Sequence, residues 1–416
     1  MQITNPLRIL FVTPYKPDLI RVRPYQFIRH LAKLGHKITL VFYDSPQNLL
    51  VDNELRSLCE DIFPIPITKT KVLFNSLKNL PTNKPFQASY GINKKMFIQI
   101  EKLIKNEYSP FDVIHFEHLR SVDFGIKLKE MNISNHTPIV WDSVDSITHL
   151  FRQASIHHPL WIGRKFLEVE TQRTSIYEPR VASVFNKVLV TSQTDLNVFV
   201  ELLTKLKINA DLVVLPNGVD LENFTPDINQ KREENTLVIS GKMSYHANQK
   251  MVSNLVKEIM PLIWKKNPDV RLWVVGQNPS KEIINFGEDP RITITGWVPE
   301  MRSFLQKATI AVAPLAYGAG IQNKILEAMA CETPVITSSS ALNALSAIPG
   351  QDLLVADDVE SFANLTIDLL SNPSRMEKIG KAGRLFVENH HSWQKAAEKL
   401  LQIYQESINS SHSLYS

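Results

Sequence analysis

Residues 309–337 read TIAVAPLAYGAGIQNKILEAMACETPVIT. The β-branched and small apolar residues of Thr309–Ala313 predict a buried strand, and the loop that follows carries two glycines. Ile321–Ala330 then has the composition of a helix, and Pro334–Thr337 predicts the next strand. This order of strand, glycine loop and helix is typical of a parallel α/β sheet, in which ligands bind beyond the carboxyl ends of the strands.

Short β-branched runs alternate with longer helical patterns along the rest of the chain, which is the signature of βαβ units. In the first half, strands are expected near Arg8–Val12, Lys37–Phe42, Asp112–Phe116, Pro138–Trp141, Lys187–Thr191 and Asp211–Leu215. In the second half, further strands are expected near Thr236–Ser240, Arg271–Val275, Arg291–Thr295 and Leu353–Ala356. The turn sequence Pro216-Asn217-Gly218 separates the two series. The predicted fold class is therefore α/β, with two doubly wound domains over residues 1–216 and 217–391.

The composition is that of an ordinary soluble protein, with 44% hydrophobic and 21% charged residues in a chain of 416. Cys59 and Cys331 lie far apart with no Cys or His at ligand spacing, which argues against a disulfide framework and a zinc site. No stretch reaches the roughly 18–20 apolar residues of a membrane span. We therefore expect a cytoplasmic protein.

Charge is unevenly distributed. The net charge of +4 is too small to indicate a nucleic-acid partner, but residues 66–105 contain eight lysines and a single acid, Glu101. This stretch predicts a peripheral contact with anionic lipid at the inner face of the plasma membrane. The alternative is a lysine-rich face that is only solvated.

Lys324 and Glu327 stand in the first turns of the helix that follows the glycine loop, on the same helix face. A lysine at this position can neutralise a diphosphate, and a carboxylate can accept two hydrogen bonds from a ribose diol. The pair therefore predicts a nucleotide-diphosphate site, with a plain surface ion pair as the alternative. Asn323 stands where a dinucleotide-binding loop has its third glycine, which disfavours a dehydrogenase.

A second group of polar residues ends the strand at 112–116. Glu117, His118 and Arg120 follow it directly, and Asp142 and Asp145 follow the next strand. Because carboxyl ends of parallel strands share one sheet edge, these side chains are expected beside the ligand. The alternatives are a structural role for His118 and helix-capping roles for the two aspartates.

The string from Gly320 to Ala330, followed by Thr333-Pro334-Val335-Ile336, resembles the donor-site signature of retaining GT-B glycosyltransferases of family 4. The closest pattern is the subgroup whose loop reads Gly-Ile-x-Asn-Lys-x-Leu-Glu. Residues 215–220, with the sequence LPNGVD, resemble the interdomain turn of this family. Two departures are clear: Ala319 stands where the common pattern has an acid, and Gly241-Lys242 represents only part of the usual diphosphate motif.

The resemblance implies two facing Rossmann-like domains with a cleft between them. The donor would be bound mainly by the C-terminal domain and the acceptor by the N-terminal one, which the C-terminal helix at 392–410 would complete. Donor contacts are implied for Lys242, Trp297, Val298, Gly320, Ile321, Gln322, Asn323, Lys324 and Glu327. Catalytic roles are predicted for His118, Glu117 and Lys324, and acceptor or phosphate contacts for Arg23, Arg120 and Asp145.

The predicted activity is transfer of a sugar from a nucleotide-diphosphate donor to a hydroxyl acceptor with retention, in glycan, polysaccharide or glycolipid biosynthesis. The nucleotide sugar is a substrate, and neither a cofactor nor a metal is expected. The sequence does not distinguish a polysaccharide, a lipid-linked sugar, a small molecule or a protein as the acceptor. The alternatives are an inactive binding or scaffold protein of the same fold, suggested by Ala319, and a nucleotide-sugar epimerase.

Overall fold

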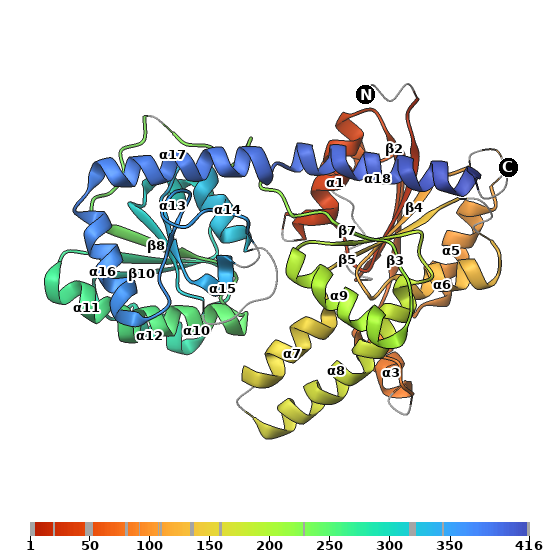
Figure 1. Ribbon diagram of the computed structural model, residues 1–416, viewed down its shortest axis with the longest axis horizontal. Helices are drawn as coiled ribbons and strands as arrows, with labels where there is room; N and C mark the ends of the chain where they lie inside the picture. Colours follow the sequence, from red (N-terminus) through yellow and green to blue (C-terminus); the bar gives the residue numbers. More distant parts are fainter. Residues whose placement is uncertain are drawn as a thin grey trace. The chain divides into compact units, whose positions relative to one another are not determined.

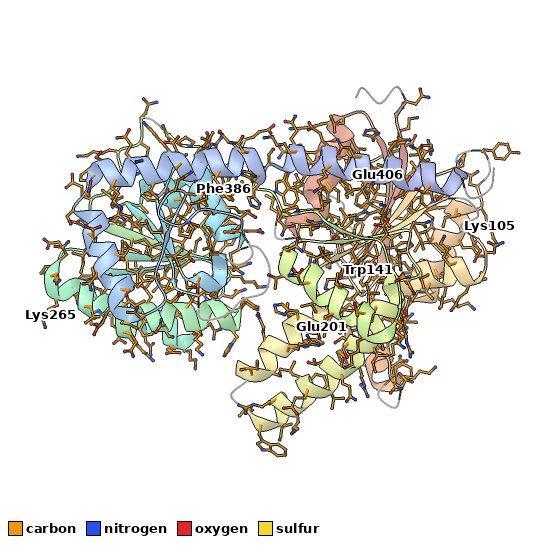
Figure 2. The ribbon with its side chains drawn as sticks, viewed as in Figure 1. Lys105, Trp141, Glu201, Lys265, Phe386 and Glu406 are labelled. Carbon is orange, nitrogen blue, oxygen red and sulfur yellow. The ribbon has the colours of Figure 1, made fainter. Side chains whose placement is uncertain are left out.

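The computed structural model describes residues 5–19, 21–45, 53–79, 82–90, 92–106, 108, 110–133, 137–157, 160–227, 229–315, 322–342 and 345–413. The chain divides into two compact units (Figures 1 and 2). Unit 1 comprises the chain up to Pro216 together with the segment from Trp393 onward, and unit 2 is Asn217–Ser392. These boundaries lie within one residue of those expected from the sequence.

Unit 1 is built on a seven-stranded parallel sheet in the order β3-β2-β1-β4-β5-β6-β7. The strands are β1 (Arg8–Thr13), β2 (Lys37–Asp44), β3 (Asp61–Pro66), β4 (Val113–Glu117), β5 (Ile139–Val144), β6 (Lys187–Val190) and β7 (Leu212–Val214). Sequence analysis did not predict β3, because its two prolines are atypical of strands. The strand lies at the sheet edge, where a residue without an N–H group is tolerated.

Helices cover both faces of this sheet (Figure 1). On one face, α1 (Val22–Lys33) and α18 (Trp393–Ser413) share an apolar core with β1 and β2. On the other face the core includes α5 (Lys94–Ile104), α6 (Val122–Glu130) and α9 (Gln193–Leu206). The remaining helices are α2 (Asn53–Leu58), α3 (Lys69–Lys78), α4 (Phe86–Tyr90), α7 (Ile147–His157) and α8 (Trp161–Ala182).

Unit 2 has a six-stranded parallel sheet in the order β10-β9-β8-β11-β12-β13. Its strands are β8 (Thr236–Ser240), β9 (Arg271–Val275), β10 (Ile292–Gly296), β11 (Ile310–Ala313), β12 (Val335–Thr337) and β13 (Leu354–Val355). Its helices are α10 (His246–Asn254), a π-helix (Leu255–Ile259), α11 (Met260–Lys266), α12 (Lys281–Phe286), α13 (Met301–Lys307), α14 (Asn323–Ala330), α15 (Ser339–Leu342), α16 (Val359–Leu370) and α17 (Pro373–His390). Both sheets confirm the predicted α/β fold class.

The C-terminal helix α18 belongs to unit 1, and its apolar residues join the core formed by α1, β1 and β2. Trp393 is buried against the edge of the Phe27 ring of α1, with ring centroids 5.4 Å apart. Tyr404 is buried as well, and its hydroxyl lies 2.8 Å from Nδ1 of His115 on β4. One helix therefore contributes both packing and a polar contact to the sheet of unit 1.

Replacing Trp393 by alanine is expected to destabilise unit 1 by about 3–5 kcal/mol, because the change removes a fully buried indole and leaves a cavity. The thermal unfolding transition of unit 1, followed by calorimetry, measures this loss. Gln394→Ala, on the exposed side of α18, is the matched control. A Trp393→Ala protein that unfolds at the same temperature as this control contradicts the prediction.

Candidate functional site

Three strand ends of unit 2 approach one another through glycines. Gly241 follows β8, Gly276 follows β9 and Gly296 ends β10. The N–H of Gly241 donates to the carbonyl of Val275 and that of Gly276 donates to Gly296, each at 3.1 Å. Gly276 has a φ of +150°, and a Cβ there would lie 1.7 Å from the carbonyl oxygen of Gly241. Only glycine permits this approach of the two backbones.

Lys324 of α14 lies over the turn after β8. Its ammonium group donates to Oδ1 of Asn248 at 2.5 Å, and Nδ2 of Asn248 donates to the carbonyl of Lys242 at 2.9 Å. A Cβ on Gly241 would lie 2.8 Å from that amide nitrogen and 3.5 Å from Cε of Lys324. Asn248, buried on α10, therefore fixes the lysine above the turn. Sequence analysis gave Asn248 no role, although it follows Gly241-Lys242 closely in the chain.

Lys324 and Glu327 lie on the same face of α14, and burial shifts both pKa values toward the neutral forms. Burial lowers the pKa of Lys324 to about 8, against the opposing effect of Glu327. Burial raises the pKa of Glu327 to about 7, against the opposing effect of Lys324. A desolvated ammonium group gains more from an incoming anion than a solvated one, because less water must be displaced. The pair is suited to binding a ligand with a diphosphate and a diol.

The other predicted donor residues are placed differently. Gly320, Ile321 and Ala319 lie outside the described residues. Gln322 precedes α14 and Asn323 begins it, and Oδ1 of Asn323 is buried with no hydrogen-bond partner among the described residues. This atom is an acceptor available to a ligand.

Trp297, Val298 and Lys242 were predicted to contact the donor. The side chain of Trp297 is 71% exposed, whereas Val298 packs against the hydrophobic core of unit 2. Lys242 is exposed. The ring of Trp297 is therefore accessible to a ligand, whereas Val298 contributes to the hydrophobic core of unit 2.

The start of the loop after β11 is fixed by hydroxyl groups. The carbonyl of Leu315 accepts hydrogen bonds from Ser338 at 2.6 Å and from Ser340 at 2.7 Å. Thr337 donates to the carbonyl of Ala313 at 2.8 Å. These bonds hold the chain that leads to the predicted donor loop.

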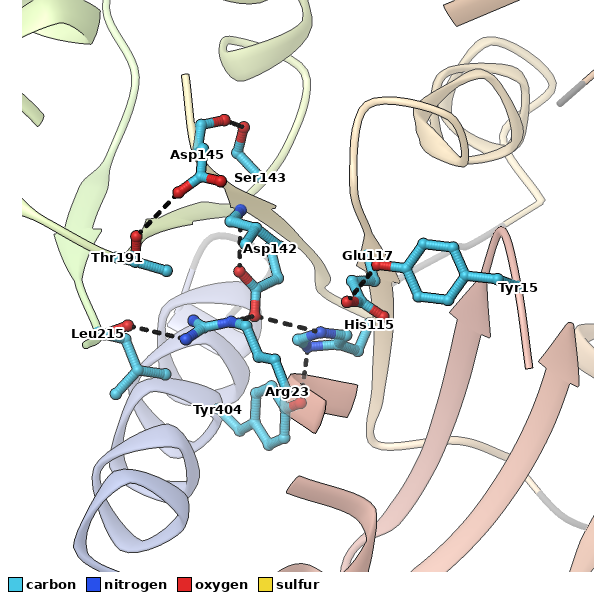
Figure 3. Close-up of polar contacts among 11 residues, drawn as sticks. Tyr15, Arg23, His115, Glu117, Asp142, Ser143, Asp145, Thr191, Leu215 and Tyr404 are labelled. Carbon is cyan, nitrogen blue, oxygen red and sulfur yellow. Dashed lines mark hydrogen bonds and ion pairs between the residues drawn. The ribbon is translucent and has the colours of Figure 1, made fainter. Parts of the chain in front are cut away.

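Unit 1 contains a buried polar cluster at the carboxyl ends of β4 and β5 (Figure 3). Nε of Arg23 donates to Asp142 at 2.7 Å, and Nη1 of Arg23 donates to the carbonyl of Leu215 at 3.0 Å. His115 lies 3.8 Å from Asp142, and burial lowers its pKa to about 4, so the imidazole is neutral. Arg23 was predicted to contact the acceptor or a phosphate, but its side chain is 4% exposed and its guanidinium forms a buried ion pair with Asp142.

Glu117 lies inside this cluster. It is 1% exposed, and Oε1 accepts a hydrogen bond from the hydroxyl of Tyr15 at 2.9 Å. Burial, and then the charge of Asp142, raise the pKa of Glu117 to about 8. A carboxyl group that is protonated at neutral pH and faces the interior is a poor nucleophile, which argues against the catalytic role predicted for Glu117.

His118 is partly buried at the end of β4. It follows β4 with a φ of +62°, a conformation that places it in the left-handed region, and its N–H donates to the carbonyl of Asp142 at 2.7 Å. Nδ1 accepts from the N–H of Arg120 at 3.3 Å. Burial, and then Arg120, lower the pKa of His118 to about 3. The neutral ring therefore carries its proton on Nε2.

Asp145 follows a bulge in β5, where Val144 has a φ of +68°. Its Oδ1 accepts from the hydroxyl of Thr191 at 3.2 Å, and burial, followed by the charge of Asp195, raises its pKa to about 7. Asp142 and Asp145 were considered as caps of the following helix, α7, but neither accepts the first N–H groups of this helix in the described hydrogen bonds. Glu178 accepts the N–H groups of residues 147 and 148 at 2.7 and 3.1 Å.

A cavity of about 510 Å³ opens in unit 1 beyond the ends of β1 and β2. Arg120 lies over the ring of Tyr90 at 4.6 Å, and Arg21 lies over that of Tyr15 at 4.3 Å. All four residues line the cavity, together with Pro14, Lys16, Tyr43, Asp44, Ser45, Ile67 and Thr68. Sequence analysis predicted Arg120 here but missed Arg21 and the tyrosines. Within the described parts of the chain, no group of three or more His, Cys, Asp and Glu residues could hold a metal ion.

Residues 234–372 match the family described as Glycosyl transferases group 1. The matched residues lie within unit 2. For this part of the chain, the match supports the glycosyltransferase resemblance found in the sequence. The strand ends, Asn248, Lys324 and Glu327 all lie within the matched residues.

Curated relatives carry glycosyltransferase names. A GDP-mannose-dependent monoacylated alpha-(1-6)-phosphatidylinositol monomannoside mannosyltransferase of Corynebacterium glutamicum is 29% identical over 46% of the chain and 55% of its own length. An MMP alpha-(1->4)-mannosyltransferase of Mycolicibacterium hassiacum is 23% identical over 91% of the chain and 92% of its own. A Staphylococcus aureus capsular polysaccharide biosynthesis glycosyltransferase is 26% identical over 45% of the chain and 52% of its own. The chain thus spans about half the length of two of these three relatives.

Solved structures confirm the GT-B fold class. Sucrose-phosphate synthase from Thermosynechococcus elongatus superposes with a TM-score of 0.69 at 18% identity, covering 97% of this chain and 100% of that one. HepE of Anabaena, solved in complex with UDP, gives a TM-score of 0.66 at 12% identity, covering 96% and 100%. At these identities the likeness concerns the fold alone.

Glu117→Gln is expected to change how the stability of unit 1 depends on pH. Folded Glu117 keeps its proton up to a pKa of about 8, whereas the unfolded residue loses it near 4.5. The wild type therefore loses stability as pH rises between these values, by up to about 1.4 kcal/mol per pH unit, and glutamine removes this loss. Thermal unfolding at several pH values measures the difference. A wild-type-to-variant difference that stays constant from pH 5 to 8 contradicts the prediction.

Proposed function

We propose that the protein transfers a sugar from a nucleotide-diphosphate donor to a hydroxyl acceptor, with retention of configuration at the anomeric carbon. The observation that carries this proposal is the position of Lys324, held by Asn248 above the glycine turn after β8 in a group 1 glycosyltransferase domain. Its ammonium group would bind the diphosphate, and Glu327 on the same helix would accept hydrogen bonds from the ribose hydroxyls.

The reaction requires stabilisation of a departing diphosphate more than a strong base. Negative charge grows on the leaving group in the transition state, and a fixed cation in a poorly solvated site stabilises it most there. Lys324 and the N-terminal N–H groups of α14 would supply this stabilisation. Metal independence belongs to the proposal because the donor-loop resemblance implies it.

In unit 1, His118 would act as a hydrogen-bond donor through Nε2, since its Nδ1 already accepts from the backbone of Arg120. Glu117 is given no role as a nucleophile, because it is buried and holds its proton at neutral pH. Asp145 and Arg120 keep their proposed roles near the acceptor. Retention without an enzyme-bound sugar then relies on the diphosphate leaving group and the acceptor occupying one face of the sugar.

We propose a UDP- or GDP-linked sugar as the donor. A relative's name specifies GDP-mannose, and structural neighbours were solved with UDP and UDP-glucose. The product would belong to polysaccharide or glycolipid biosynthesis, as the names of the relatives indicate for those proteins.

Contact of residues 66–105 with an anionic membrane, and a cytoplasmic location, remain predictions. Helices α3 and α5 carry most of these lysines, and Lys84 is paired with Asp123. Within the described residues, no helix is long and apolar enough to cross a membrane.

Lys324→Ala is expected to lower turnover about 10²–10³-fold, because one charge contact to the leaving group is lost. The assay measures release of nucleoside diphosphate from UDP-, GDP-, ADP- and dTDP-linked sugars, with water as the acceptor. Lys265→Ala, on the surface of unit 2 (Figure 2), is the matched control. Turnover in Lys324→Ala equal to that of the control contradicts the assignment. Proton NMR of a product formed with an added acceptor reports retention or inversion.

A further inference from the structure

Two arginines, Arg21 and Arg120, line the cavity of unit 1. Nε of Arg120 donates to Gln87 at 2.6 Å, and the guanidinium lies on the Tyr90 ring. Arg21 lies on the Tyr15 ring. Among the described residues neither guanidinium forms an ion pair with a carboxylate. Burial lowers the pKa of Arg120, and the charge of Arg21 adds a smaller effect in the same direction.

Two guanidinium groups that lie near each other and have no ion-pair partner among the described residues are suited to bind an anion. The tyrosine rings fix the planes of the guanidinium groups, so less side-chain entropy is lost when they bind an oxyanion. Glu117, which accepts the hydrogen bond of the Tyr15 hydroxyl, has a pKa raised by burial to about 8 and adds no negative charge at neutral pH. The cavity of about 510 Å³ also accommodates more than a lone ion.

The cavity offers an acceptor for hydroxyl groups beside these cations. Asp44 lines it at the end of β2, and Oδ2 of Asp44 is buried without a hydrogen-bond partner among the described residues. A carboxylate oxygen without a hydrogen-bond partner is suited to accept a hydrogen bond from a hydroxyl group of a sugar or polyol. Aromatic rings, guanidinium groups and a carboxylate together match a phosphorylated polyol or sugar.

We propose that this cavity binds an acceptor that carries a phosphate group, with Arg21 and Arg120 on the phosphate and Asp44 on a hydroxyl. The ligand's role as the sugar acceptor rests on the proposed function. Binding of a phosphorylated ligand in this cavity does not depend on that function. The phosphate belongs to the acceptor and is distinct from the donor diphosphate assigned to Lys324 of unit 2.

Calorimetric titration of the full chain with glycerol 3-phosphate, with glycerol as the uncharged control, tests the proposal. Binding is expected for glycerol 3-phosphate, weakened about tenfold or more by Arg120→Gln and by Arg21→Gln. Arg180→Gln, an exposed arginine on α8, is the matched control. Absence of binding to the wild type, or binding that Lys324→Ala removes and Arg120→Gln does not, overturns it. UDP and GDP titrations run in parallel show separately whether the donor site is functional.

A different observation concerns the helical hairpin of α7 and α8, which extends from the sheet of unit 1 (Figure 1). Large apolar side chains are exposed around its turn, and Trp161 is 73% exposed. We define the hairpin cap as the exposed residues Ile156, Leu160, Trp161, Ile162 and Phe166. Nothing in the described part of unit 1 covers this cap.

Basic residues accompany the cap. Arg164 and Lys165 follow Trp161 in α8, where Lys165 also forms an exposed ion pair with Glu168 at 2.6 Å. The ring of Phe86 in α4 packs against Phe166, with ring centroids 6.2 Å apart, and α4 in turn contacts α3. On α3, which contains no acid, Lys71, Phe74 and Lys78 are exposed at positions i, i+3 and i+7 of one face.

We propose that the hairpin cap inserts into the interface of an anionic phospholipid bilayer. Tryptophan and aliphatic side chains prefer this interface, and nearby lysines and arginines are attracted to anionic headgroups. The charge of α3 is what favours a bilayer over a second copy of the chain, because two copies would bring like charges together. Together with the lysine-rich stretch at residues 66–105, the hairpin cap would supply the apolar part of this membrane contact.

Co-sedimentation of the full chain with phosphatidylcholine vesicles, with and without 30% phosphatidylglycerol, tests this proposal. Binding is expected only with phosphatidylglycerol, and is expected to fall several-fold at high salt and in the Leu160→Ser, Trp161→Ser double variant. Met131→Ser, an exposed apolar residue elsewhere in unit 1, is the matched control. Unchanged vesicle binding in the double variant overturns the proposal. A variant effect on oligomer mass in sedimentation velocity, with no vesicle binding by the wild type, assigns the cap to a second copy instead.

Discussion

The candidate donor site depends on the close approach of two backbones at the ends of β8 and β9. Because a Cβ at Gly276 would lie 1.7 Å from the carbonyl oxygen of Gly241, this edge of the sheet is compact only with glycine there. With this close backbone approach, Asn248 can hydrogen-bond both the carbonyl of Lys242 in the turn after β8 and the ammonium group of Lys324. The local backbone constraint thus places a desolvated ammonium group where a helix N-terminus also favours anions.

In unit 1, a buried ion pair rather than a glycine contact lies at the carboxyl ends of the strands. Arg23 and Asp142 form a buried ion pair, and His115 joins it to Tyr404 of the C-terminal helix. This cluster fixes the ends of β4 and β5 from the inside, and His118, which follows β4, has a left-handed backbone conformation. The buried charges at these strand ends thus fix the backbone, whereas Arg120, which lines the cavity, can contact a ligand.

Local periodicity was enough to predict the parallel strands and the α/β fold class. Strand-end motifs led to Lys324, Glu327 and His118, whose roles stay predictions. The sequence did not predict the edge strand β3, whose prolines hide it, or the burial of Arg23, whose partner Asp142 is more than a hundred residues away. Arg21 and Tyr15 were missed for the same reason. Their stacking and their shared cavity with Arg120 exist only once β1 and β4 are paired.

Thermal stabilisation of the full chain by UDP, GDP, ADP and dTDP, compared with Glu327→Ala, tests most directly whether unit 2 binds a nucleotide diphosphate. A nucleotide at 100 times its dissociation constant should add about 2.7 kcal/mol to the stability of the folded state. The account predicts that one or two of these nucleotides stabilise the wild type and that Glu327→Ala loses most of the effect, because the ribose contact is gone. No stabilisation by any of them, or equal stabilisation of the variant, would contradict it.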